Sequence, residues 1–161
     1  MVSVVYESLG GSTERYARTF ASKLGLDVHP LDDRDLPPSS DIIFFGWRAG
    51  PMISGLKDAK VSYNVMAAVC VGLFTLREKD ERLMRKKNDI DTLFYLKGGM
   101  DRSSLTLGQK VFLGLMNIVA ITCYRSEDDR KARKILNRGG DLSSDDQLDA
   151  LIDWYDTIDK G

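Results

Sequence analysis

A short β-branched run, a glycine-rich loop and an amphipathic helix follow one another at the start of the chain, and this order constrains the fold more than any other feature. The run covers residues 2–6, and the loop Ser8–Thr13 holds two glycines and three hydroxyl side chains. Apolar side chains then recur at helical spacing, which predicts a helix from about Ser12 to Leu24. A strand, a tight turn and a helix open a β-α-β unit, so we expect a parallel sheet covered by helices.

Four later apolar runs predict the remaining strands. They lie at residues 26–31, 41–47, 65–73 and 92–96. The middle two are continuously apolar, which is typical of parallel strands that are covered on both faces. With right-handed crossovers, the sequence predicts a doubly wound α/β fold whose five-stranded parallel sheet has the order 2-1-3-4-5.

Helical segments separate or follow these runs. We expect helices near residues 53–57, 77–88 and 144–159. A sheet of this size needs only one closing helix after its fifth strand, yet an insertion of about 101–140 comes first. The insertion combines a hydrophobic helix, 107–122, with a charged stretch, and we interpret residues 1–161 as a single domain.

Composition excludes several classes of protein. The net charge is −1 and 43% of the residues are hydrophobic, so the chain lacks both the basic excess of nucleic-acid binders and the composition of a disordered protein. Cys70 and Cys123 lie among apolar residues and are expected to be buried, while His29 stands alone, so no metal site is predicted. The first residues lack the features of a signal peptide, which makes a cytoplasmic location the expectation.

The loop after the first strand is the strongest binding candidate. It consists of Ser8, Leu9, Gly10, Gly11, Ser12 and Thr13. Glycine lets an anion approach the backbone, while hydroxyls and the free N–H groups of the first helical turn donate hydrogen bonds to it. Helix capping by Ser12 or Thr13 is the alternative, but capping needs only one of these hydroxyls. We therefore predict a phosphate site. It is not one of the common nucleotide sites, because the motifs of nucleotide-hydrolysing and dinucleotide-binding loops are absent.

Two further loops follow strands at the same edge of the predicted sheet. One consists of Trp47, Arg48, Ala49 and Gly50, and the other of Gly72, Leu73, Phe74 and Thr75. In open α/β sheets, ligands bind at the carboxyl ends of the strands. An aromatic side chain there stacks on a planar ring or packs in the core, and both interpretations stay open for Trp47 and Phe74.

These three loops resemble those of the flavodoxin family. The family's phosphate motif, T/S-x-T-G-x-T, matches at Ser8, Gly11, Ser12 and Thr13, with Gly10 in place of its middle threonine. Within the family the chain looks nearest to the menaquinone-dependent protoporphyrinogen oxidase branch, because of the Trp47–Gly50 segment and the hydrophobic helix inserted after the fifth strand. The resemblance implies a flavodoxin-like fold that binds FMN through the three loops, with the chemistry carried by the cofactor.

An electron-transfer function is what this resemblance implies. The protein would be a carrier or an FMN-dependent oxidoreductase, and its partner a redox protein or a quinone. The alternatives are a quinone-coupled oxidoreductase of the protoporphyrinogen oxidase type and a flavodoxin-fold binding module that has lost flavin. Flavodoxins are typically strongly acidic, and the net charge of −1 leaves room for a hydrophobic or membrane-borne partner.

The hydrophobic helix of the insertion bears on that partner. We expect it at the edge of the crevice, with an apolar face that comprises Val111, Phe112, Leu115, Met116 and Val119. Through residues 101–123 it would dock on a partner, a quinone or a membrane surface. The alternative is that the helix packs on the sheet as core, and the weak amphipathicity and flanking charge leave both open.

Overall fold

A parallel sheet forms the centre of the fold. The computed structural model describes residues 1–159, and the parallel strands are β1 Ser3–Tyr6, β2 Val28–Pro30, β3 Asp41–Ala49, β5 Asn64–Gly72 and β6 Leu93–Lys97. They run in the order β2-β1-β3-β5-β6, which is the order predicted from the sequence. A short strand that was not predicted, β4 (Met52–Ile53), pairs antiparallel with the end of β3. Because β4 is counted, the fourth and fifth predicted strands carry the labels β5 and β6.

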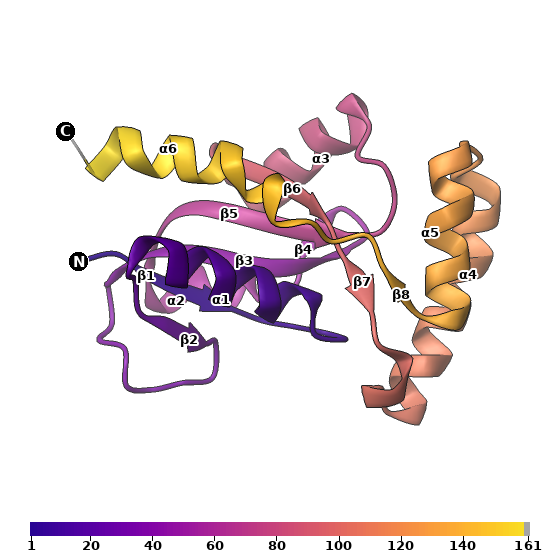
Figure 1. Ribbon diagram of the computed structural model, residues 1–161, viewed down its shortest axis with the longest axis horizontal. Coiled ribbons are helices and arrows are strands. Elements are labelled where there is room, and N and C mark those ends of the chain that lie inside the picture. Colours follow the sequence, from indigo (N-terminus) through magenta and orange to yellow (C-terminus); the bar gives the residue numbers. More distant parts are fainter. Residues whose placement is uncertain (160–161) are drawn as a thin grey trace.

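Helices cover both faces of this sheet (Figure 1). One face carries α1 Ser12–Leu24 and α6 Asp149–Asp159, and the other carries α2 Leu56–Ser62 and α3 Glu78–Asn88. Neighbouring strand residues divide between the faces, because side chains alternate along a strand. Phe45 of β3 packs in the cluster with α1 and α6, whereas Phe44 packs in the cluster with α2 and α3.

The start of α1 is set by two glycines. Gly10 and Gly11 have φ angles of +77° and +90°, a left-handed conformation that turns the chain from β1 into the helix at little steric cost. Tyr16 and Phe20 then lie on the buried stripe of the helix, and Gly25 ends it in the left-handed conformation. The bounds Ser12 and Leu24 are those predicted.

The insertion leaves the sheet and returns to it through a narrow ribbon. Its elements are β7 Gly99–Met100, a 3-10 turn at Arg102–Ser104, α4 Leu107–Cys123, α5 Glu127–Arg138 and β8 Gly140–Asp141. β7 and β8 pair antiparallel, and Figure 1 shows α4 and α5 side by side beyond one end of the sheet. The sequence predicted α4 but neither the ribbon nor the helical state of the charged stretch, where Ser126 and Asp129 form a capping box.

Three predictions need correction. The helix expected near 53–57 begins only at Leu56, because residues 52–53 pair with β3 instead. The closing segment starts with a 3-10 turn, Asp145–Leu148, before α6 itself. Cys70 is buried in β5, where burial raises its pKa to about 12, but Cys123 is exposed at the end of α4, since that helix packs mainly against α5.

Asn88 joins α3 to the β3–β4 hairpin from within the core. Its Nδ2 donates to the carbonyl oxygens of Met84 (2.7 Å) and Pro51 (2.9 Å), and its Oδ1 accepts from the amide of Ile53 (3.0 Å). Asn88→Ala is expected to lower the free energy of unfolding by about 2–4 kcal/mol, because each unsatisfied buried polar group costs about 1–3 kcal/mol.

Chemical denaturation measures this change. Lys86→Ala, an exposed position on the same helix, is the control and should alter the free energy of unfolding by less than about 0.5 kcal/mol. Equal stabilities of Asn88→Ala and the unmodified protein would contradict the role given to these hydrogen bonds.

Candidate functional site

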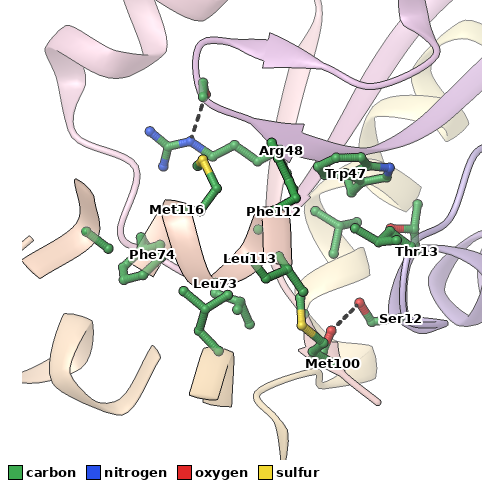
Figure 2. A pocket seen from close by; sticks show the side chains of 18 of the residues that line it. Ser12, Thr13, Trp47, Arg48, Leu73, Phe74, Met100, Phe112, Leu113 and Met116 are labelled. Atoms are coloured by element: carbon green, nitrogen blue, oxygen red, sulfur yellow. Dashed lines mark hydrogen bonds between the residues drawn. The ribbon is translucent and has the colours of Figure 1, made fainter. Parts of the chain in front are cut away.

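The carboxyl ends of β1, β3, β5 and β6 meet at one edge of the sheet beside a cavity of about 120 Å³. Residues from all three predicted loops line it: Leu9, Ser12, Thr13, Trp47, Arg48, Gly50, Gly72, Leu73 and Phe74. Figure 2 shows side chains of α4, such as Phe112 and Leu113, among those of the three predicted segments. The structure therefore brings the three predicted segments together at one place, as the parallel topology predicted. The second segment is not a loop, however, because β3 continues through Trp47, Arg48 and Ala49 to pair with β4 and β5.

Five predicted residues do not line this cavity: Ser8, Gly10, Gly11, Ala49 and Thr75. Gly10 and Gly11 line the polar groove next to it, and Ser8 lines a separate groove. Ala49 belongs to the β3–β4 hairpin, and the backbone of Thr75 contacts the insertion. Ala49 and Thr75 thus have structural partners of their own, which weakens their assignment to a binding site.

The first turn of α1 has the features of an anion site. Gly11 stands at the N-cap without a side-chain cap, and the amides of Ser12 and Thr13 have no acceptor in the part of the chain that the structure describes. Two of the predicted hydroxyls are already engaged, because Ser8 Oγ accepts from the amide of Glu14 (3.3 Å) and Ser12 Oγ donates to a carbonyl of β7 (3.0 Å). The capping contact is therefore made by Ser8 and not by Ser12 or Thr13.

Thr13 is the hydroxyl that stays free. The residue is 0% exposed, and its Oγ1 finds no hydrogen-bond partner among residues 1–159. It lines the cavity on the same side as Trp47 (Figure 2). A buried hydroxyl without a partner costs about 1–3 kcal/mol, and an acceptor on a ligand at this position would remove that cost.

Trp47 forms a wall of the cavity together with α4. Its ring meets that of Phe112 edge to face, with centroids 6.5 Å apart and an interplanar angle of 74°. The indole is half-buried and lines the cavity. Of the two interpretations left open by the sequence, packing against a neighbour is observed, and the neighbour comes from the insertion.

Arg48, the next residue of β3, brings a buried cation to the cavity. Its side chain is 10% exposed, its Nη2 donates to Tyr124 Oη (2.9 Å), and its Nε donates to the carbonyl of Gly50 (3.2 Å). A carboxylate oxygen of Asp80 lies 3.9 Å away. The remaining nitrogen, Nη1, is buried and has no hydrogen-bond partner within the described residues, so the cavity holds a second unsatisfied polar group.

The pKa values of Arg48 and Tyr95 are both shifted upward. Burial lowers the pKa of the Arg48 guanidinium, but the neighbouring Tyr95 and Tyr124 raise it by more, so the net shift is upward. Burial also raises the pKa of Tyr95, whose hydroxyl donates to the carbonyl of Phe74 (2.5 Å). No group of three His, Cys, Asp or Glu side chains within residues 1–159 is arranged to hold a metal ion. These residues offer binding groups rather than an acid–base pair.

The insertion supplies a wall of the cavity, and most of the residues in this wall were not predicted from the sequence. Its lining residues include Met100, Phe112, Leu113, Met116, Val119, Ala120, Tyr124 and Leu136. Three of them were expected at the crevice edge, whereas Val111 and Leu115, expected beside them, face solvent. The alternative that α4 packs on the sheet as core is wrong, because only two residues of this helix are buried. In the sequence, these residues could be recognised only by the helical spacing of apolar side chains. This spacing identifies the apolar face of a helix but not the surface that the face covers.

A buried carboxylate attaches α5 to the loop after β5. Asp129 is 1% exposed, and its oxygens accept from the amides of Thr75 (3.2 Å) and Ser126 (3.3 Å). Burial raises the pKa of Asp129, but hydrogen bonds from Ser126 and Thr75 and the charge of Arg77 lower it by more, so the net shift is downward. This anchor holds the insertion next to the cavity.

Comparison with known proteins gives no match for this chain. No model of a protein family matches the chain, and no curated protein matches it. Among the helices of residues 1–159, none has the length and apolar character needed to cross a membrane. The function of the cavity is therefore inferred from its own residues.

The lowered pKa of Asp129 predicts an acid-sensitive attachment of the insertion. The carboxylate contributes fully above the unfolded-state pKa of about 3.9, and its contribution is lost as the pH falls through the lower folded-state pKa. Asp129→Asn lacks this contribution at every pH. Its free energy of unfolding should therefore lie below that of the unmodified protein at neutral pH and approach it as the pH falls through the folded-state pKa of Asp129.

Denaturation curves over this pH range, with hydrogen exchange of the Thr75 amide, measure the effect. Asp128→Asn is the matched control, because Asp128 is exposed and its ion pairs within residues 1–159, with Lys97 and Lys131, lie at the surface. A stability difference between Asp129→Asn and the unmodified protein that stays constant down to the lowest pH would count against the anchor.

Proposed function

We propose that this protein is a flavodoxin-like electron-transfer protein that binds FMN at the ends of β1, β3 and β5. A parallel sheet in the order β2-β1-β3-β5-β6 with helices on both faces supports a flavodoxin-like sandwich. The observation that carries the proposal is the buried, unpartnered hydroxyl of Thr13 at a helix N-terminus whose first amides are also free. A phosphate suits such a set of neutral donors.

The phosphate end of the site would rest on backbone groups and one hydroxyl. The amides of Ser12 and Thr13 and the Thr13 hydroxyl donate to it, and the left-handed Gly10 and Gly11 keep side chains away from it. The adjacent polar groove carries three arginines against two aspartates, so its net charge also favours an anion.

The ring end of the site would lie between the sheet loops and α4. FMN, when bound, supplies reversible electron and hydride transfer. Trp47 and Phe74 line the space on the sheet side, and Arg48 holds a fixed positive charge there. A nearby cation favours negative charge on a bound group, so Arg48 would raise the reduction potential of the ring.

The cavity admits a ring only when α4 moves outward. Its volume of about 120 Å³ is below the roughly 300–1,000 Å³ of most ligand pockets. Leu113 of α4 is the cause, because it packs with Leu136 against Leu73 and Phe74 of the sheet loops. Ring binding and the position of α4 are therefore coupled.

Two alternatives are each favoured by one observation. The small cavity favours a flavodoxin-fold binding module without flavin, whose crevice the insertion keeps closed. The apolar wall that Phe112 and Val119 contribute favours a quinone-coupled oxidoreductase of the protoporphyrinogen oxidase type over a simple carrier. Binding of FMN excludes the first alternative, and turnover with quinone acceptors would support the second.

Titration of the apoprotein with FMN tests the proposal, with quenching of flavin fluorescence as the measurement. Thr13→Val keeps the shape and removes the donor, so the Kd should rise by about 10- to 150-fold, which corresponds to the roughly 1.5–3 kcal/mol of a hydrogen bond to a charged group. Thr157→Val, at an exposed position of α6, is the matched control and should leave the Kd unchanged. Absence of quenching at micromolar protein, or equal Kd values for Thr13→Val and the unmodified protein, would refute the phosphate site.

A second titration tests the coupling between ring binding and α4. Leu113→Ala removes the side chain that occupies the crevice, so FMN should bind more tightly, by about tenfold or more. Leu115→Ala makes the same change on the solvent side of the same helix and should not alter the Kd. Equal effects of the two substitutions would show that α4 does not have to move.

A further inference from the structure

α4 presents an uncharged apolar face to solvent. Five of its residues, which we name the apolar stripe, are between 51% and 79% exposed: Leu107, Val111, Leu115, Ile118 and Ile121. At about 100° per residue they fall on one side of the helix, and at about 1.5 Å per residue the stripe is about 21 Å long. An exposed surface of this kind marks an interaction site on a folded protein.

The apolar stripe has a different neighbour along each of its two long sides. On one side Phe112 and Val119, which are 43% and 55% exposed, also line the cavity. On the other side Ile121 lines a groove between α4 and α5. A continuous apolar surface therefore runs from the cavity across α4 to this groove.

The groove between α4 and α5 is basic. Its charged lining residues are Arg130, Arg133, Lys134 and Arg138. None of these four cations lies within 4.0 Å of a carboxylate in the described residues, 1–159. Their charge is therefore not neutralised by the protein and can act on an external anion.

The insertion and the rest of the chain carry opposite charges. Residues 101–140 contain eight Lys and Arg against four Asp and Glu, a net charge of +4, and since the whole chain has a net charge of −1, the remainder carries −5. Figure 1 shows the α4–α5 hairpin at one end of the molecule and the N-terminus at the other. The apolar stripe thus lies at the positive end of an electrically polarised molecule.

We propose that the α4–α5 hairpin docks the protein on an anionic bilayer surface. The apolar stripe enters the boundary between lipid headgroups and acyl chains, and the four cations of the groove contact lipid phosphates beside it. A helix that lies in this plane does not need the length of a membrane-spanning helix. The inference goes beyond the proposed FMN site and does not depend on it.

A second copy of the chain is a poorer occupant of this surface. Two apolar stripes paired about a two-fold axis would bring together two insertions, each with a net charge of +4. Like charges across an interface oppose association, whereas the same charges are attracted to an anionic bilayer. Charge therefore selects the membrane as the partner.

Docking in this orientation also places one wall of the cavity near the bilayer. Phe112 and Val119 belong both to the wall of the cavity and to the surface beside the apolar stripe. With the stripe in the bilayer, these two side chains lie between the headgroup region and the cavity, and the rest of α4 separates the two.

Sedimentation with vesicles of phosphatidylcholine containing about one third phosphatidylserine tests the proposal. Leu115→Asp with Ile118→Asp should weaken binding by more than about 30-fold, because two side chains lose their apolar contact. Arg130→Gln with Lys134→Gln should weaken it by about 25-fold, or about fivefold for each charge removed. Val61→Asp, at an exposed apolar position on α2, is the matched control and should bind as the unmodified protein does.

Three outcomes would overturn the inference. The first is equal binding to pure phosphatidylcholine vesicles, and the second is full binding by the Leu115→Asp, Ile118→Asp variant. The third is a dimer, detected by light scattering, which that variant dissociates and which does not bind vesicles. Circular dichroism and FMN titration of each variant keep the tests separate, because loss of FMN binding with vesicle binding retained would count only against the FMN site.

Discussion

Parallel pairing of β1 with β3 is the constraint on which the candidate site depends. It sets Tyr6 opposite Phe45, so the glycine loop after β1 and the end of β3 that holds Trp47 lie at the same edge of the sheet. β5 and β6 continue the alignment, with Gly72 opposite Lys97. Because the strands that bear these loops run in one direction, residues far apart in the sequence meet without any special arrangement of side chains.

The cavity combines two different surfaces. The sheet side holds a buried hydroxyl, a buried guanidinium nitrogen and the free amides of a helix N-terminus, all of which favour an anionic or strongly polar group. The insertion side is apolar, through residues such as Phe112 and Leu113, and it excludes water from those polar groups. A ligand with a charged end and a planar apolar part would satisfy both surfaces, which is why the proposed cofactor follows from the site and from the fold together.

The structure could be predicted from the sequence where local and global signals agree, but not where tertiary contacts decide the position of a residue. α1 could be predicted to the residue, because its glycines, apolar period and terminal glycine all give the same bounds. Leu113 and Leu115 cannot be distinguished in the sequence, yet one is 5% exposed in the cavity wall and the other 61% exposed to solvent. The hydroxyl of Ser12 was assigned to a phosphate, but it donates to Gly99, which lies 87 positions away along the chain and belongs to a ribbon with no sequence signature.

The β7–β8 ribbon brings the two ends of the insertion together. Gly99 pairs with Asp141 and Met100 with Gly140, so the chain leaves the sheet domain and rejoins it at adjacent points. In evolution, a hairpin attached in this way can be acquired, lost or exchanged without changing the order of the strands or the helices that cover them. Selection can therefore act on the two parts separately, on the sheet through the cavity that it lines and on the hairpin through the surface that it exposes.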